Sequence, residues 1–173
     1  MVFSSSLFCS CPCLTLSILG QSLTITGSLH MIGNEPFTRL VCNGASGRTY
    51  VLQGEILAEL KNLQGATVEL EGGEKGRTPD YQLPIFLVTG YRVLLINGRE
   101  PLIGLLCQKE GRVLLRTENG RIYTLSSGFG EKMQEAIGAK VWVCGEVKGS
   151  CFSWLTKRYQ LSVTSFGVIA PAE

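Results

Sequence analysis

Apolar and polar residues alternate along several short stretches near the start of the chain. Between Leu23 and Gly27, threonines separate the apolar positions. A second run over 37–42 ends in the turn-forming segment NGASG, and a third run follows over 48–52. Side chains at every second position of a strand lie on one face of a sheet, so these runs predict three half-buried strands.

The hydrophobic period changes after the third run. Apolar residues recur over 56–63 at the spacing of one helical face, and Gly65 is the residue type that commonly ends a helix. Strand patterns return over 66–70 and over 85–93. The segment 72–77, GGEKGR, is rich in Gly and Lys and is expected to form the loop between these last two strands.

The same order of patterns occurs a second time. SGRTYVLQG is matched by NGRIYTLSSG, which places Gly47 and Gly120 73 positions apart. GATVELEGGEKG at 65 and GAKVWVCGEVKG at 138 keep the same offset. TITGSL and PLIGLL lie 77 positions apart, so the copies differ in loop length. A whole domain of about 70 residues is therefore repeated once.

Each copy predicts the order β-β-β-α-β-β. That order resembles the OB-fold, a five-stranded Greek-key barrel. The resemblance implies a mainly β protein with two tandem OB-fold-like barrels, over 22–96 and 102–170, joined by a linker at 97–101. SH3-like small barrels are the alternative, although they need no helix in the middle. Because each unit is small, the apolar run 93–96 is expected to supply an interface shared by the two barrels.

The first 21 residues differ from the rest of the chain. They carry no charge, and the apolar run Leu14–Gly20 resembles the hydrophobic part of a secretory signal, with cleavage expected before Gln21. This reading predicts export to the periplasm or cell envelope, with no transmembrane helix in the mature chain. The alternatives are a cytoplasmic chain with a misassigned start, and a lipid anchor on a cysteine such as Cys11.

The cysteines do not form a pattern that predicts a metal site. Cys9, Cys11 and Cys13 lack the paired spacing of zinc ligands, and His30 is the only histidine in the chain. We therefore expect neither a metal nor a cofactor. Cys144 and Cys151 are candidates for a disulfide in an oxidising compartment.

The sequence offers little for catalysis. A Ser/His/Asp triad would have to use His30, and Asp80 is the only aspartate. GGEKGR lacks the Lys-Ser/Thr ending of a phosphate-binding P-loop. The chain is therefore expected not to be an enzyme.

Charge and aromatic residues favour a binding surface on the second copy. Residues 1–97 carry six Lys and Arg against seven Asp and Glu, whereas residues 98–173 carry ten against seven. OB-folds bind ligands on strands two and three and on the loops after strands one and four. The segment 149–160 is expected to be such a loop, and the first-copy segment KGRTPDYQ, with one Tyr and an added Asp, is the poorer candidate. Tyr50 and Tyr123 are expected to point into the barrels. The predicted ligand-binding residues are Phe152, Trp154, Lys157 and Arg158 in that segment, with Arg112 and Arg116 on the second strand of the copy.

The sequence thus predicts a non-enzymatic binding or scaffolding module of the cell envelope, whose partner is a protein or an envelope component. The alternative is a cytosolic tandem OB-fold protein that binds single-stranded nucleic acid. A steep dependence of affinity on salt would separate the two, since contacts to phosphates release counterions.

Overall fold

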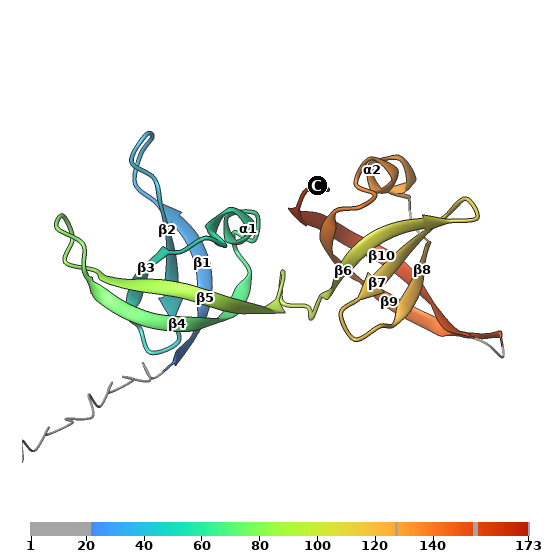
Figure 1. Ribbon diagram of the computed structural model, residues 1–173, viewed down its shortest axis with the longest axis horizontal. Coiled ribbons are helices and arrows are strands. Elements are labelled where there is room, and N and C mark those ends of the chain that lie inside the picture. Colours follow the sequence, from blue (N-terminus) through green and yellow to red (C-terminus); the bar gives the residue numbers. More distant parts are fainter. Residues whose placement is uncertain (1–21, 127, 154–155, 173) are drawn as a thin grey trace, which may run out of the picture.

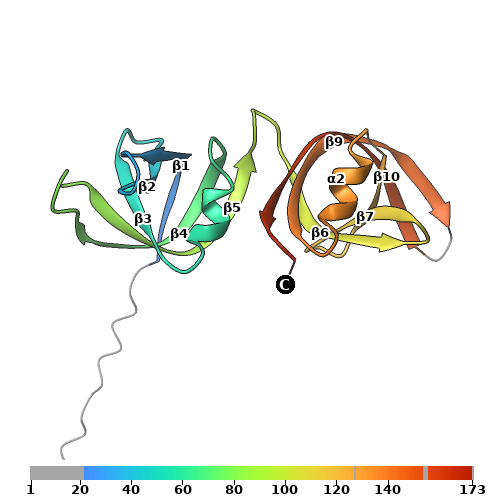
Figure 2. The same ribbon diagram turned by 90° about the horizontal axis from the view of Figure 1, so that it is seen from above.

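The computed structural model describes residues 22–126, 128–153 and 156–172 of the 173. They form two closed, five-stranded barrels that follow one another along the chain (Figures 1 and 2). The expected export signal and Cys9, Cys11 and Cys13 lie outside the described residues. Within the described part, no helix has the length and apolar character needed to cross a membrane.

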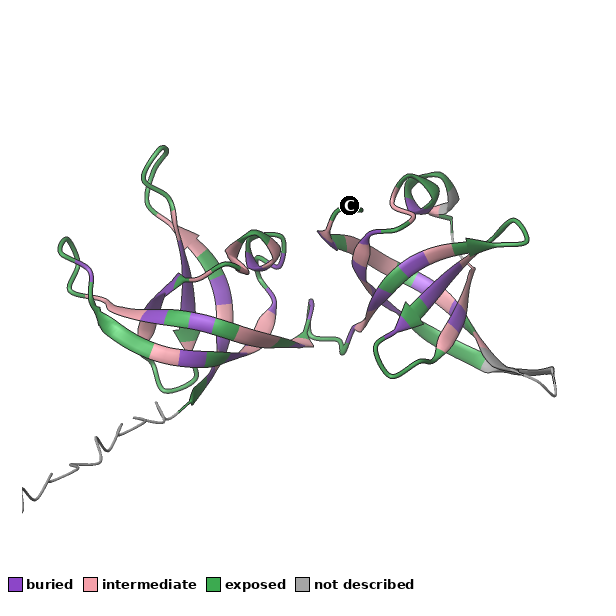
Figure 3. Ribbon diagram, viewed as in Figure 1, coloured by how far each residue is buried: buried purple, intermediate pink, exposed green. Residues whose placement is uncertain are grey.

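The first barrel holds five strands and one short helix. Its strands close in the order β1-β2-β3-β5-β4, with β3 and β5 parallel and the other neighbouring pairs antiparallel. Buried positions recur at every second residue along parts of β1, β4 and β5, whereas β2 and β3 each bury three successive residues (Figure 3). The elements are β1 (Leu23–Ile32), β2 (Arg39–Gly44), β3 (Thr49–Gln53), α1 (Leu57–Lys61), β4 (Thr67–Arg77) and β5 (Pro84–Leu95).

The second barrel repeats this topology. Its strands close in the order β10-β8-β7-β6-β9, and β8 and β10 are the parallel pair. A helix between the third and fourth strands, and the closing pair of the first and fourth, are features of the OB-fold. The prediction of two tandem OB-fold barrels is confirmed, and SH3-like barrels do not fit. The elements are β6 (Leu102–Lys109), β7 (Arg112–Thr117), β8 (Ile122–Ser126), α2 (Gly130–Glu135), β9 (Lys140–Ser153) and β10 (Thr156–Ala170).

The residues shared by the copies specify the barrel. Gly47 and Gly120 have φ of 78° and 76°, the left-handed conformation that favours glycine in the turn before the third strand. Tyr50 and Tyr123 are each 5% exposed, which confirms that both point into their barrels. At Gly72, a Cβ would overlap the carbonyl oxygen of Leu87 on β5, so only glycine lets the strands approach this closely.

Two segments expected to be loops are strands. Residues 72–77 belong to β4, and Arg77 still pairs with Pro84 on β5. The prediction was wrong because Gly72 accommodates a close approach to β5, and the pairing of β4 with β5 continues across register shifts at 71–72 and 74–77. The segment 149–160 is likewise mostly part of the β9–β10 ladder, where Phe152 pairs with Lys157.

The register of β9 also excludes the expected disulfide. Cys144 and Cys151 lie on this one strand, seven positions apart, which corresponds to roughly 23 Å in extended backbone. A disulfide requires Cα atoms within about 7 Å. Cys144 is a buried free thiol.

The two barrels share an apolar interface. Cys144 and Ile169 of the second barrel belong to the same buried cluster as the core of the first, and Trp142 packs against that cluster. Val93 and Ile96 are in it as well, which confirms that the run 93–96 contributes to a shared interface. The interface explains how two units near the lower size limit for an independent core can be stable.

Polar contacts fix the relative position of the barrels. The side chain of Asn62, next to α1, donates to the carbonyl of Ile169 on β10 at 2.9 Å. Lys140 Nζ of β9 lies 2.9 Å from Glu59 Oε2 on α1 and 3.2 Å from the hydroxyl of Tyr91 on β5. That hydroxyl donates to the same Glu59 carboxylate. The result is a three-residue network that joins the barrels.

The protonation states of this network follow from its geometry. Burial opposes the charge on Glu59, yet hydrogen bonds from Tyr91 and Lys140 outweigh it and lower the pKa of this carboxyl. Burial likewise opposes the charge on Lys140, and its hydrogen bonds to Glu59 and Tyr91 raise the pKa of the amine. Burial and the bond to Glu59 raise the pKa of Tyr91 to about 12. Both charges and the phenol proton are therefore held at neutral pH.

Candidate functional site

The two copies differ at the connection between their first two strands. In the first barrel, residues 33–38 form a loop between β1 and β2. In the second, Glu110 and Gly111 close a two-residue turn between β6 and β7, with φ of 54° and 73°. The first barrel therefore has a long loop at a position where OB-folds bind ligands, and the second does not.

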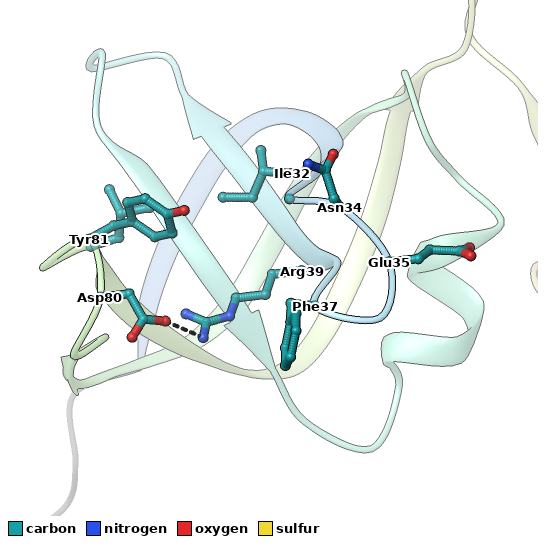
Figure 4. Close-up of a pocket in the computed structure, with 9 residues that line it drawn as sticks. Ile32, Asn34, Glu35, Phe37, Arg39, Asp80 and Tyr81 are labelled. Atoms are coloured by element: carbon teal, nitrogen blue, oxygen red, sulfur yellow. Dashed lines mark hydrogen bonds and ion pairs between the residues drawn. The ribbon is translucent and has the colours of Figure 1, made fainter.

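This loop and the loop 78–83 between β4 and β5 enclose a pocket (Figure 4). Its volume is about 770 Å³, which is within the range of small-ligand sites. Most of the lining is apolar or aromatic. The lining residues are Ile32, Gly33, Asn34, Glu35, Phe37, Arg39, Asp80, Tyr81 and Leu83.

Two aromatic side chains stand at the pocket with most of their surface exposed. Phe37 is 78% exposed and Tyr81 is 70% exposed. They come from different loops and lie on either side of the Arg39 side chain in Figure 4. Exposed aromatic rings in a barrel that buries Tyr50 and Phe86 do not serve the core. Such rings are suited to stack against a flat ligand.

Hydrogen bonds order the loop that carries Tyr81. The backbone N–H of Thr78 donates to the carbonyl of Leu83 at 2.8 Å, and its hydroxyl accepts from the N–H of Leu83 at 3.2 Å. Arg77 donates to the carbonyl of Gln82 at 3.1 Å. On the other side of the pocket, the N–H of Phe37 donates to the carbonyl of Asn34 at 2.7 Å. Both aromatic rings are therefore carried by structured turns.

Arg39 is the one cation among the described residues that line this pocket. Its Nη2 lies 2.7 Å from Oδ2 of Asp80. A neighbouring depression of about 300 Å³ shares Leu83 with the pocket and is lined by Arg48 and Arg77. Positive charge is therefore available in the adjoining depression, which Glu74 also lines, whereas Arg39 in the pocket is paired with Asp80.

The predicted site residues of the second copy are not brought together into a described site. Phe152, Lys157 and Arg158 lie in the β9–β10 ladder, but their side chains, like Trp154, lie outside the described residues. Arg112 and Arg116 are exposed on β7. Their role as ligand contacts stays a prediction.

The site in the first barrel was the one that the sequence ranked lower. The apolar run that begins at Phe37 predicts a strand there, and the single Tyr and the Asp of KGRTPDYQ make that segment the poorer candidate. One signal did point to it. The offset between the copies falls from 77 to 73 between their first and third strands, so the first copy has four more residues there. Those residues account for the longer loop at 33–38.

The described residues contain no group of three or more His, Cys, Asp or Glu side chains placed to hold a metal ion. His30 is exposed on β1, where a ring nitrogen lies 3.1 Å from the hydroxyl of Ser28. The pocket itself offers aromatic rings for stacking, and Arg39 and Asp80 for hydrogen bonding and charge pairing.

Comparison with known proteins adds little to this geometry. No protein-family model matches the chain, and no curated protein matches it. Among solved structures, the chain is similar to the wild-type single-stranded DNA binding protein from Thermus aquaticus, at 13% identity over 88% of this chain and 94% of that one, with a TM-score of 0.29. A deletion mutant of that protein gives 15% identity, 88% and 96% coverage and a TM-score of 0.28. Similarities at this level identify no ligand for this chain.

Proposed function

We propose that the chain is a non-enzymatic binding protein and that its first barrel binds single-stranded nucleic acid. The observation that carries this proposal is the pair of exposed rings, Phe37 and Tyr81, on the two loops that flank Arg39. Unpaired bases stack on aromatic side chains, and each stacked base contributes about 1–3 kcal/mol by alanine substitution. Double-stranded DNA keeps its bases stacked on each other and cannot use such rings in this way.

The cations near the pocket support contacts to the backbone of the strand. Arg48 and Arg77 line the adjoining depression, where they would meet phosphates next to the stacked bases. Two such contacts give a slope of roughly −1.4 for log affinity against log salt, at about −0.7 per phosphate on a single strand. We therefore expect moderate affinity with a measurable but shallow dependence on salt.

Fluorescence anisotropy with a labelled 15-nucleotide single strand tests this proposal. Phe37→Ala and Tyr81→Ala should each weaken binding by about 5- to 150-fold, the equivalent of one lost stacking contact. Leu23→Ala is the matched control, because Leu23 is an exposed apolar residue at the opposite end of β1 from the pocket. If neither aromatic variant changes the affinity, the pocket is not the nucleic-acid site.

A protein partner is the second candidate. It is favoured by the two carboxylates of Asp80 and Glu35 among the pocket residues, against the single cation Arg39. A surface with this balance and an apolar lining also suits a peptide segment. If the protein does not bind an oligonucleotide at low salt, a protein partner becomes the favoured proposal.

The compartment decides whether that partner is a component of the cell envelope. Export stays a proposal that depends on residues 1–21, which lie outside the described part. Mass spectrometry of the N-terminus from native cells tests it. A start at Gln21 supports export, a lipid on a cysteine near the start adds anchoring, and an intact Met1 favours the cytoplasm.

A further inference from the structure

The ion pair inside the pocket blocks the cation that a phosphate would use. Arg39 is the first residue of β2, and its guanidinium reaches across the pocket to the Asp80 carboxylate on the loop 78–83 (Figure 4). The side chains are 34% and 54% exposed, so both remain accessible from solvent. A phosphate oxygen approaching Arg39 would have to take the place of Asp80 Oδ2.

Asp80 is presented at this position by the fold of its loop. The hydrogen bonds between Thr78 and Leu83 close the loop on both sides of Asp80. Gln82 adds a bond from its N–H to the carbonyl of Thr78 at 3.1 Å, and has the left-handed φ of 52°. The carboxylate therefore stays near the pocket whether or not it is paired with Arg39.

We propose that Asp80 is a built-in competitor for the phosphate backbone, and that it sets the selectivity of the pocket. This inference rests on the function proposed above. While Asp80 neutralises Arg39, a strand gains from stacking on Phe37 and Tyr81 but gains little from Arg39. Binding is thus weighted toward unstacked bases and against polyanions that offer charge alone.

Replacing Asp80 should tighten binding, whereas replacing an ordinary binding-site residue weakens it. Asp80→Asn should raise the affinity for a 15-nucleotide single strand about fivefold, which is the most that an exposed ion pair of this kind is worth. It should also steepen the slope of log affinity against log salt by about 0.7, because one more phosphate contact forms. Heparin, a polyanion without bases, should compete better against the variant than against the unaltered protein.

Arg39→Gln supplies the decisive background. If Asp80 acts through Arg39, then adding Asp80→Asn to Arg39→Gln should leave both the affinity and the salt slope within about twofold of the single Arg39 variant. Glu55→Gln removes one negative charge from an exposed loop elsewhere on the first barrel and controls for net charge. Circular dichroism and thermal unfolding of each variant check that the barrel is folded.

The outcomes separate this inference from the proposed function. Tighter binding by Asp80→Asn that disappears in the Arg39→Gln background supports the competitor. An unchanged or weaker affinity in Asp80→Asn, with Phe37→Ala still defective, overturns the competitor but leaves the nucleic-acid site standing. If neither the unaltered protein nor Asp80→Asn binds the strand at low salt, both proposals fail.

Discussion

Lys140 is the residue through which the polar interface between the barrels can best be tested. Replacing it with Met keeps the length of the aliphatic stem but removes the amine that contacts Glu59 and Tyr91. The amine also lies 5.1 Å from the centre of the Tyr91 ring. Lys140→Met therefore removes the hydrogen bonds that the amine donates to the Glu59 carboxylate and to the Tyr91 hydroxyl, together with a cation–π contact. The Glu59 carboxylate then keeps only its hydrogen bond from Tyr91.

The expected loss follows from the exposure of the pair. Hydrogen bonds to charged groups contribute about 1.5–3 kcal/mol, and fully exposed ion pairs about 0–1 kcal/mol. The side chains of Lys140 and Glu59 are 30% and 28% exposed, which places the contact between these cases. We expect Lys140→Met to lower the free energy of unfolding by about 1.5 kcal/mol, or the Tm by about 3–6 °C for a protein of this size.

The size of this effect should depend on pH. The pKa of Glu59 is lowered from 4.5, so its contribution to stability is present above that value and is lost as pH falls through the folded-state pKa. The pKa of Lys140 is raised from 10.5, so its contribution is present below that value and is lost as pH rises through the folded-state pKa. The difference between Lys140→Met and the unaltered protein should therefore be largest between about pH 5 and pH 10 and shrink on both sides.

Urea unfolding followed by tryptophan fluorescence is a suitable assay, because Trp142 packs against the shared cluster. A double-mutant cycle of Lys140→Met with Glu59→Gln should give a coupling energy of about 1 kcal/mol at pH 7. A loss below about 0.5 kcal/mol, with no coupling, would refute the claim that this network joins the barrels.

Three further predictions concern the core and the cysteines. Ile169 belongs to the second barrel but is fully buried in the first barrel's cluster. Ile169→Ala should lower the free energy of unfolding by about 2–5 kcal/mol and lower the urea midpoint of the first barrel. Gly72→Ala should lower the free energy of unfolding by about 3 kcal/mol, because the added Cβ overlaps the backbone of β5. Gly47→Ala should lower it by about 1 kcal/mol, because the added Cβ meets open space but φ is 78°. Equal losses of stability in thermal unfolding would contradict this expectation. Burial raises the pKa of the Cys42 thiol to about 11. In the folded protein at pH 7.5, maleimide should therefore modify the half-buried Cys107 and leave Cys42 unmodified, which peptide mapping can measure.

The barrel could be predicted from the sequence because the patterns that specify it lie within short segments and occur twice. The turn glycines Gly47 and Gly120, the inward Tyr50 and the helix spacing of 56–63 each require only a short window. The lengths of β4 and β9 could not be read this way. A Gly- and Lys-rich segment is typical of a loop, and only its pairing across the barrel makes it a strand.

The candidate site depends on contacts between distant residues. Arg39 and Asp80 are 41 positions apart, and the contact between Glu59 and Lys140 spans 81 positions. No local pattern predicts either contact. The apolar residues after Phe37 predict a strand at this position, whereas the four extra residues of the first copy indicate the loop that the structure has at 33–38.

The most direct test of the nucleic-acid proposal is to map where a single strand touches the chain. Ultraviolet crosslinking of a 15-nucleotide strand to the full protein, followed by mass spectrometry of the peptides, compares the two barrels in one experiment. We predict crosslinks in the loops 33–38 and 78–83, at Phe37 and Tyr81, and their loss when both are changed to Ala. Crosslinks confined to 149–160 of the second barrel, or none at low salt, would contradict a binding site in the first barrel.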